Sequence, residues 1–372
     1  MNRYSKQSLR GFSMIEMMVG VVISMLAILV IFEAFAVFEG QRRTTTSATA
    51  AQESGLLALS AIDRDARMAG YGMVVNNMLA CASVNVFQNG AAGTIPFLPI
   101  AITDGGGAAN DSITVMYSTS PFAPTPALLS VDSPASAPVV SVSNTASNAV
   151  FKTGDFFLVA QPTLGKPCSR LRVTGTTMVA ADVQLAHASS DPMNPPVATN
   201  IFPTLPTPGY TASATDQSVV INMGAMTRST YSIVNRSLAY TDETRATAPV
   251  ALSAGIVSLQ AQYGIAAAGT QTVNEWVDAK SAQWATPSAV DIPRIKAIRI
   301  AIIARSPILE KGNVTPICVN NAGNNKGPCA WQDTASSPAP LIDLSADPDW
   351  QRYRYRVYET IVPLRNVLWG NV

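Results

Sequence analysis

The sequence predicts an α+β fold: one long N-terminal α-helix, with its first half in a membrane, packed on a domain with an antiparallel β-sheet. An uncharged apolar run extends from Met17 to Phe32, and a proline-free stretch rich in Ala, Ser, Thr and Gln follows from Gln41 to Arg67. Short β-branched or aromatic runs separated by turn residues fill much of the remainder. With 372 residues, the chain is long enough for this helix and one large or two smaller domains.

The first residues predict how the helix enters the membrane. A basic leader with Arg3, Lys6 and Arg10 precedes the apolar run, which favours an N-terminus-in orientation. The uncharged run spans roughly 24 Å, so its flanks are needed to cross a bilayer core. Glu16 is the exception in this region, because a carboxylate at membrane depth costs on the order of 2.5 kcal/mol or more unless it is neutralised or near the interface.

Residues Gly11-Phe12-Ser13-Met14-Ile15-Glu16 resemble the class III signal of type IV prepilins and pseudopilins. The resemblance implies that a prepilin peptidase cuts between Gly11 and Phe12 and that Phe12 is then N-methylated. It also implies that Glu16 pairs with the terminal amine of a neighbouring subunit during docking. Most family members have Thr-Leu where this chain has Ser13-Met14.

Two other interpretations of this region stay open. A secretory signal peptide also begins with a basic stretch and an apolar core, and Ala34-Phe35-Ala36 offers a small-x-small cleavage site. A simple transmembrane anchor is the other alternative. Two observations argue against the signal peptide: the length of the apolar run and the Gly-Phe pair ahead of Glu16.

The helix is expected to continue beyond the membrane. Leu56, Leu59, Ile62 and Ala66 recur at helical spacing and predict a stripe that faces a domain. Asp63 and Arg67 lie four residues apart, which supports a helix by a few tenths of a kcal/mol. Gly70-Tyr71-Gly72 is expected to end it. The stretch 57–71 resembles the corresponding segment of the PilW family of minor pilins.

Strands separated by loops are predicted for the middle of the chain. Proline-rich stretches over 118–138 and 190–211 indicate loops or a boundary between subdomains. Asn235-Arg236 is a predicted hairpin turn. The predicted strands are Ser112–Tyr117, Asp155–Ala160, Val219–Met223, Tyr231–Val234 and Ser237–Tyr240.

Three C-terminal segments extend the resemblance to the PilW family. Residues 253–264 alternate as a half-buried strand does, and 294–305 place Ile298, Ile300 and Ile302 opposite Arg299 and Arg305. Residues 352–366 resemble the closing strand and tail of the family. The expected organisation is a leader (1–11), a transmembrane helix (12–38), its periplasmic continuation (39–72), and a β-rich domain (73–372) of one or two subdomains.

The cysteines are expected to form disulfides, because all four follow the membrane segment and a periplasm is oxidising. Cys318 and Cys329 bracket a segment rich in Asn and Gly that a bridge closes into a small loop, which leaves Cys81 with Cys168. Four cysteines allow three pairings, so this pairing is a preference. A zinc site lacks support, because there is no Cys-x-x-Cys spacing and His187 is the only histidine.

Composition argues against several functions. Charged residues make up 13% of the chain and its formal net charge is +1, and neither value indicates nucleic-acid binding. Gly105-Gly-Gly107 lacks the Lys and Ser/Thr of a phosphate loop. Asp104 with Asp111, and the three aspartates between 343 and 349, lack the spacing of a calcium loop. Without a Gly-x-Ser-x-Gly elbow or a Cys-His pair, we expect no enzyme, no cofactor and no metal.

The resemblance implies a minor pilin that helps to initiate a type IV pilus and joins its tip complex, supporting twitching motility and adhesion. The implied partners are other minor pilins, the major pilin, the prepilin peptidase, a PilY-type tip adhesin and the bacterial inner membrane. The C-terminal domain is then expected in the periplasm. A minor pseudopilin of a type II secretion system and a membrane-anchored adhesin are the alternatives.

Overall fold

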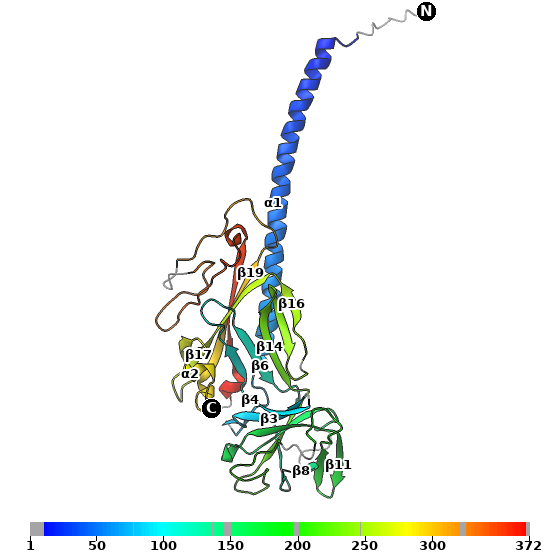
Figure 1. Cartoon of the computed structure of the whole chain (residues 1–372), viewed down its shortest axis with the longest axis vertical. Helices are drawn as coiled ribbons and strands as arrows, with labels where there is room; N and C mark the ends of the chain where they lie inside the picture. Colours follow the sequence, from blue (N-terminus) through cyan, green and yellow to red (C-terminus); the bar gives the residue numbers. More distant parts are fainter. Residues whose placement is uncertain are drawn as a thin grey trace, which may run out of the picture.

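The computed structural model describes residues 11–76, 78–88, 90–135, 137–143, 150–196, 201–245, 247–319 and 325–369. Its dominant element is the helix α1 (Met14–Met68), which is 55 residues long and contains no proline. Its first half stands clear of the chain, and its second half packs on the β-rich part (Figure 1). The predicted architecture, a long N-terminal helix followed by antiparallel sheets, is confirmed.

Two antiparallel sheets hold the second half of α1. The first has the order β16-β15-β14-β6-β5 and the second the order β18-β17-β19-β20. Ile62, Tyr231, Tyr263 and Ile300 lie in the single core that joins the helix to both sheets. The strands are β5 (Ile100–Thr103), β6 (Ser112–Tyr117), β14 (Thr227–Val234), β15 (Ser237–Asp242), β16 (Val250–Ala254), β17 (Ile256–Ala266), β18 (Val273–Val277), β19 (Ile295–Arg305) and β20 (Tyr355–Pro363).

The prediction that residues 253–264 form a half-buried strand is wrong, because β17 is buried on both faces. Its polar side chains donate to loop carbonyls instead of meeting water. Gln260 Nε2 donates to the carbonyl of Ala109 at 2.9 Å, and Gln262 Nε2 donates to the carbonyl of Pro338 at 2.9 Å. Two loops therefore cover the face that the sequence pattern assigned to solvent.

Arg299 lies on that same covered face. It is opposite the isoleucines of β19, as expected, but it is buried rather than solvated. Its guanidinium carbon lies 4.9 Å from the ring centroid of Trp276 and 3.9 Å from that of Trp331. Burial lowers the pKa of Arg299 to about 10. The charge is held by hydrogen bonds to Gln262 and Ser337 and by the two indole faces.

The end of the molecule away from the free helix contains two more sheets (Figure 1). A six-stranded sheet has the order β4-β3-β10-β9-β13-β7, and a three-stranded sheet has the order β11-β12-β8. The pair β3/β10 is parallel, an exception to the predicted antiparallel arrangement. The strands are β3 (Ser83–Gln88), β4 (Ala91–Pro96), β7 (Ala127–Leu128), β8 (Val139–Ser143), β9 (Phe156–Ala160), β10 (Cys168–Arg172), β11 (Gly175–Val179), β12 (Asp182–Ala186) and β13 (Val219–Gly224).

Local turn chemistry is where prediction and structure agree most closely. Asn235 and Arg236 both have positive φ, 50° and 58°, and join β14 to β15 as the predicted two-residue hairpin. The five strands predicted between 112 and 240 are all present, each within a few residues of its predicted bounds. The remaining elements are β1 (Val74–Val75), β2 (Met78–Leu79), α2 (Ala282–Ala285), α3 (Arg365–Trp369) and three 3-10 turns at Pro162–Leu164, Ile292–Arg294 and Trp350–Arg352.

Candidate assembly site

The predicted processing segment lies at the start of α1. Ser13 is the N-cap: its Oγ accepts the backbone N–H of Ile15 at 3.3 Å, and Glu16 Oε2 accepts the backbone N–H of Ser13 at 3.2 Å. This reciprocal capping box satisfies two amides that the helix leaves open. Gly11 and Phe12 precede the cap, and the Phe12 side chain is 84% exposed. Cleavage between Gly11 and Phe12 stays a prediction.

The basic leader itself, with Arg3, Lys6 and Arg10, falls outside the described residues. What the structure adds is the position of Glu16. Its carboxylate lies beside the backbone of Ser13, which is one residue from the amine that a cut after Gly11 would create. A carboxylate at this place is therefore positioned to meet a terminal amine, either its own or that of a neighbouring chain.

The first half of α1 presents an apolar surface on every side. It contains a stretch that is long and apolar enough to cross a membrane, and none of that stretch is buried. A helix that is apolar all round needs lipid or other protein as its surroundings. The large apolar side chains that are half exposed or more include Met17, Met18, Val19, Val21, Val22, Ile23, Met25, Leu26, Ile28, Leu29, Val30, Ile31 and Phe32.

The second half of α1 contacts the sheets through small residues. Ala51, Gly55, Ala58 and Ile62 are buried at spacings of three and four. A Cβ added at Gly55 would overlap the ring of Tyr358, so only glycine allows β20 to lie this close. The expectation for Leu56 is wrong: it is 50% exposed, because the buried stripe runs one residue earlier, through Gly55.

The end of α1 is fixed by its own charges and by the C-terminus. Arg67 donates two hydrogen bonds to Asp63, at 2.7 and 2.8 Å, the predicted four-residue pair. Asn366 Nδ2 lies within hydrogen-bonding distance of three carbonyls of the last turn, those of Arg67, Met68 and Ala69, at 3.5, 3.2 and 3.2 Å. Helix ends leave such carbonyls without partners, so Asn366 supplies a C-cap from nearly 300 residues away.

Asp65 is a buried carboxylate that sequence analysis missed. It is only 4% exposed, and Tyr231 of β14 donates its hydroxyl to Asp65 Oδ2 at 2.8 Å. Arg64, which is largely exposed, pairs with the other oxygen at 3.3 Å. Burial, and next the charge of Asp65, raise the pKa of Tyr231, so the tyrosine stays a donor. Helical spacing placed Asp65 beside the stripe, but its partner lies 166 residues away.

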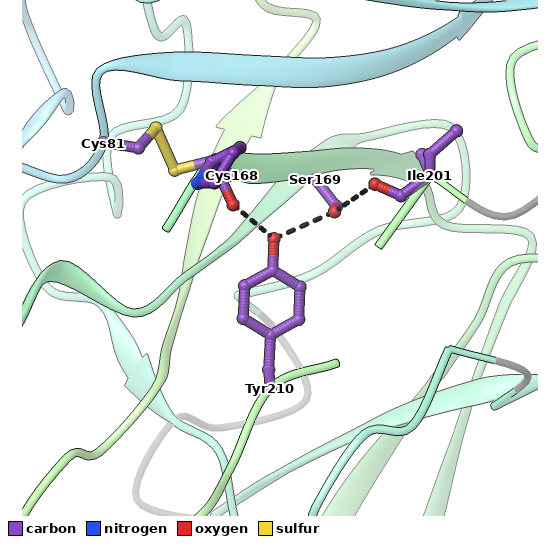
Figure 2. Close-up of a disulfide and its surroundings, with 6 residues drawn as sticks. Cys81, Cys168, Ser169, Ile201 and Tyr210 are labelled. Carbon is purple, nitrogen blue, oxygen red and sulfur yellow. Dashed lines mark hydrogen bonds between the residues drawn. A yellow bond between two sulfur atoms is a disulfide. The ribbon is translucent and has the colours of Figure 1, made fainter. Parts of the chain in front are cut away.

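The two disulfides join Cys81 to Cys168 and Cys318 to Cys329, the pairs preferred from the sequence. Cys81 precedes β3 and Cys168 begins β10, so the first bridge fixes the adjacent starts of the parallel pair. Figure 2 shows a hydrogen-bond network beside this disulfide. Tyr210 Oη lies 2.8 Å from the carbonyl of Pro167 and 2.9 Å from Ser169 Oγ. Ser169 Oγ in turn donates to the carbonyl of Ile201.

The residues weighed for other chemistry have structural partners. Asp111 Oδ1 accepts the backbone N–H of Gly105, and Asp111 Oδ2 accepts that of Ala261. Asp347 pairs with Arg305 at 2.7 Å, and Asp349 with Arg352 at 3.0 Å. Within the described ranges, no three His, Cys, Asp or Glu side chains gather as they would around a metal ion.

His187 packs between aromatic rings, 6.5 Å from Phe157 and 6.3 Å from Phe202 by ring centroids, and burial lowers its pKa. Gly106 and Gly107 have φ values of 79° and 59°, as a turn requires. Of the C-terminal arginines, Arg354 pairs with Glu310 at 2.8 Å, and β20 begins only at Tyr355.

Comparisons with known proteins agree with this geometry. A helix that is free along its first half and packed on antiparallel sheets along its second is the architecture that the resemblance to type IV pilins implies. Within that class, the family model described as Type IV Pilus-assembly protein W, PilW, matches residues 219–366 of this chain. The match covers less than half of the chain, but it includes β14, β17, β19 and β20, which cover α1. The predicted resemblance to the PilW family is confirmed for this region.

A search of the curated proteins gives no match. Among solved structures, a type IV-like pilin, TTHA1219 from Thermus thermophilus, matches with 8% identity, covering 85% of this chain and 96% of that chain at a TM-score of 0.33. The family match therefore relates residues 219–366 of this chain to type IV pilus-assembly proteins.

Proposed function

We propose that this protein is a minor pilin that takes part in initiating type IV pilus assembly and in the complex at the pilus tip, and so supports twitching motility and adhesion. Before assembly it sits in the inner membrane through α1, with its sheets in the periplasm. Its partners are other minor pilins, the major pilin and a PilY-type tip adhesin, and the prepilin peptidase removes residues 1–11.

One observation carries the proposal: the region that matches PilW supplies most of the strands that pack on α1, while the first half of α1 is predominantly apolar and uncovered. A subunit built this way presents one surface to lipid and later to neighbouring helices. Glu16 at the start of that surface then favours a neighbour that brings a positive charge.

Processing gives the first test. Mass spectrometry of the purified protein is expected to find a methylated N-terminus at Phe12, and Gly11→Val is expected to leave the leader attached. Gly20→Val is the matched control, because Gly20 likewise has open space around its Cα but lies inside the helix. A mature chain that begins at Val37, after Ala36, would instead establish a secretory signal peptide.

Deletion of the gene gives the second test. Loss of surface pili and twitching with normal protein secretion supports the proposal, and restoration requires the wild-type gene. Loss of secretion with normal piliation would identify a minor pseudopilin of a type II secretion system. Normal piliation and secretion together with lost surface binding would identify a membrane-anchored adhesin.

A further inference from the structure

A cleft of about 850 Å³ separates α1 from the segment that follows β19. One wall is the helix, from Glu33 through Val37 and Gly40 to Arg43. The other wall is the segment Ile308–Gly312 together with Arg354. In Figure 1 this segment lies at the end of the β-rich part that faces the free half of α1. The cleft therefore opens toward the apolar half of the helix.

The position of the cleft along α1 corresponds to the outer surface of a membrane. Twenty-one residues separate Phe12 from Glu33, which is about 30 Å of helix, the thickness of a hydrocarbon core. Glu33 then marks the outer edge of the core, and the cleft occupies the level of the lipid headgroups. This step rests on the proposed function, in which α1 sits in the membrane before assembly.

The wall opposite the helix is preformed. Glu310 donates its backbone N–H to the carbonyl of Arg352 at 2.9 Å, and Ser306 Oγ donates to the carbonyl of Ile308 at 3.2 Å. Arg354 Nε donates to Glu310 Oε1 at 2.8 Å, which neutralises both side chains. The backbone N–H groups of Ser306 and Val314 donate to the carbonyls of Arg354 and Gln351, both at 2.8 Å, so the chain that leads into β20 holds the segment at both ends.

Two cations remain at the cleft. Arg43 and Lys311 line opposite walls, both are exposed, and neither has an ion-pair partner among the residues that the structure describes. Between Glu33, at the membrane edge, and these two cations the lining is apolar, with Ala36 and Val37 on the helix and Leu309 on the other wall. Apolar surface below and positive charge above match the order of groups in a phospholipid, with acyl chains below and a phosphate above.

We propose that this cleft binds one membrane phospholipid. Arg43 and Lys311 bind the headgroup phosphate from the two walls. The glycerol and the first acyl carbons lie against Val37 and Leu309. The bound lipid bridges the helix and the β-rich part at the membrane surface and is released when the subunit leaves the bilayer.

Lipid retention tests the proposal. The full chain is inserted in nanodiscs of phosphatidylglycerol and phosphatidylcholine, released into mild detergent, and examined by native mass spectrometry for bound phosphatidylglycerol. Wild type is expected to keep one lipid. The double variant Arg43→Gln with Lys311→Gln is expected to retain less phosphatidylglycerol, with each replacement lowering retention by about tenfold. The matched control is Arg42→Gln with Lys152→Gln, which removes the same charge outside the cleft.

A second variant blocks the cleft without changing charge. Gly40 lines the cleft and has no heavy atom within 4 Å of an added Cβ, so Gly40→Phe fills the space and leaves the helix intact. Gly20→Phe is its control, since Gly20 is equally open but lies within the membrane stretch. Retention that falls for Gly40→Phe and not for Gly20→Phe supports the site.

Resistance to alkaline extraction, which measures membrane insertion, distinguishes failure of the proposed function from failure of the lipid site. If wild type is not inserted in the membrane, the proposed function fails. If wild type is inserted but retains no more phosphatidylglycerol than the double glutamine variant, the lipid site is wrong and the proposed function stands. Equal losses in the cleft variants and their controls also refute the site.

Discussion

At the scale of single residues, the hydrogen bond between Tyr231 and Asp65 ties α1 to the five-stranded sheet. Removing the hydroxyl with Tyr231→Phe takes one hydrogen bond from a buried carboxylate, which keeps the exposed Arg64 and the side chain of Tyr117 as partners. We expect a loss of about 1 to 3 kcal/mol in the free energy of unfolding. Denaturant titration of the protein in detergent measures it. Tyr240→Phe is the control, because its hydroxyl only accepts a hydrogen bond, from Ser229; equal losses would mean that Asp65 is not the cause.

Glu16 has two roles that separate by substitution. Glu16→Ala is expected to leave membrane insertion and leader cleavage near normal and to reduce recovery with other minor pilins in sheared fibres, as a partial defect. Glu16→Gln keeps an acceptor for the amide of Ser13 but removes the charge. If docking depends on charge, both variants lose incorporation. Wild-type incorporation of Glu16→Gln alone assigns the effect to the capping bond, and normal incorporation of both refutes a docking role.

At the scale of elements, the two disulfides are expected to stabilise unequally. Cys81 and Cys168 are 87 residues apart, which corresponds to about 4.5 kcal/mol of loop-closure entropy in the unfolded chain. Cys318 and Cys329 are 11 apart, which corresponds to about 3 kcal/mol. Serine replacement of each pair, followed by denaturant unfolding without reductant, measures both. A larger loss at the short loop would contradict this order.

The contact between α1 and β20 depends on the absence of a side chain at Gly55. Gly55→Leu is expected to displace the ring of Tyr358 and to cost about 1 to 3 kcal/mol by overpacking. Gly20→Leu, in open space, is expected to cost nothing. Adding Tyr358→Ala to Gly55→Leu should recover part of the loss in thermal unfolding. Failure to recover would place the strain elsewhere.

At the scale of the whole molecule, Asp111 makes the stability of the two sheets that pack on α1 depend on pH. It immediately precedes β6 and accepts the backbone N–H of Ala261 in β17. Burial raises its pKa to about 6, against the pull of its two hydrogen bonds, and the charges of Asp104 and Asp278 add to the rise. Lys280 faces the same group of aspartates.

The sign of the pH effect follows from that raised pKa. The folded chain holds the proton of Asp111 more tightly than the unfolded chain does, so this residue's contribution to stability is complete below about pH 4. The contribution of Asp111 to the free energy of unfolding decreases by on the order of 3 kcal/mol as the pH rises from about 4 to about 6. The difference between wild type and Asp111→Asn, measured by unfolding at several pH values, isolates this contribution. A difference that does not change with pH would refute it.

Sequence patterns predicted the parts of this molecule that local chemistry determines. The hairpin at Asn235-Arg236 and the ion pair between Asp63 and Arg67 each depend on neighbours within a few residues. Gln260 and Gln262 were assigned to solvent because alternating polarity cannot reveal that the carbonyls of Ala109 and Pro338 cover them. The partner of Asp65 was missed for the same reason.

The distal sheets were the least predictable part. β3 and β12 alternate polar and apolar residues over only four or five positions, and β10 does not alternate, so these short runs are hard to distinguish from loops. The parallel pairing of β3 and β10 joins segments more than 80 residues apart, and only the cysteines at their starts mark that they meet. The cleft beside α1 was also beyond sequence analysis, because its two walls are more than 260 residues apart.

The cap that Asn366 places on α1 has a consequence for the order of biosynthesis. The helix emerges from the ribosome first, but the strand and the side chain that cover its second half are made almost 300 residues later. At about 5–20 residues per second, the stripe around Gly55 and Ala58 stays uncovered for roughly 15–60 s. The nascent chain therefore spends most of its translation with part of this apolar face uncovered, and native packing of the helix is completed only as the last strand is released.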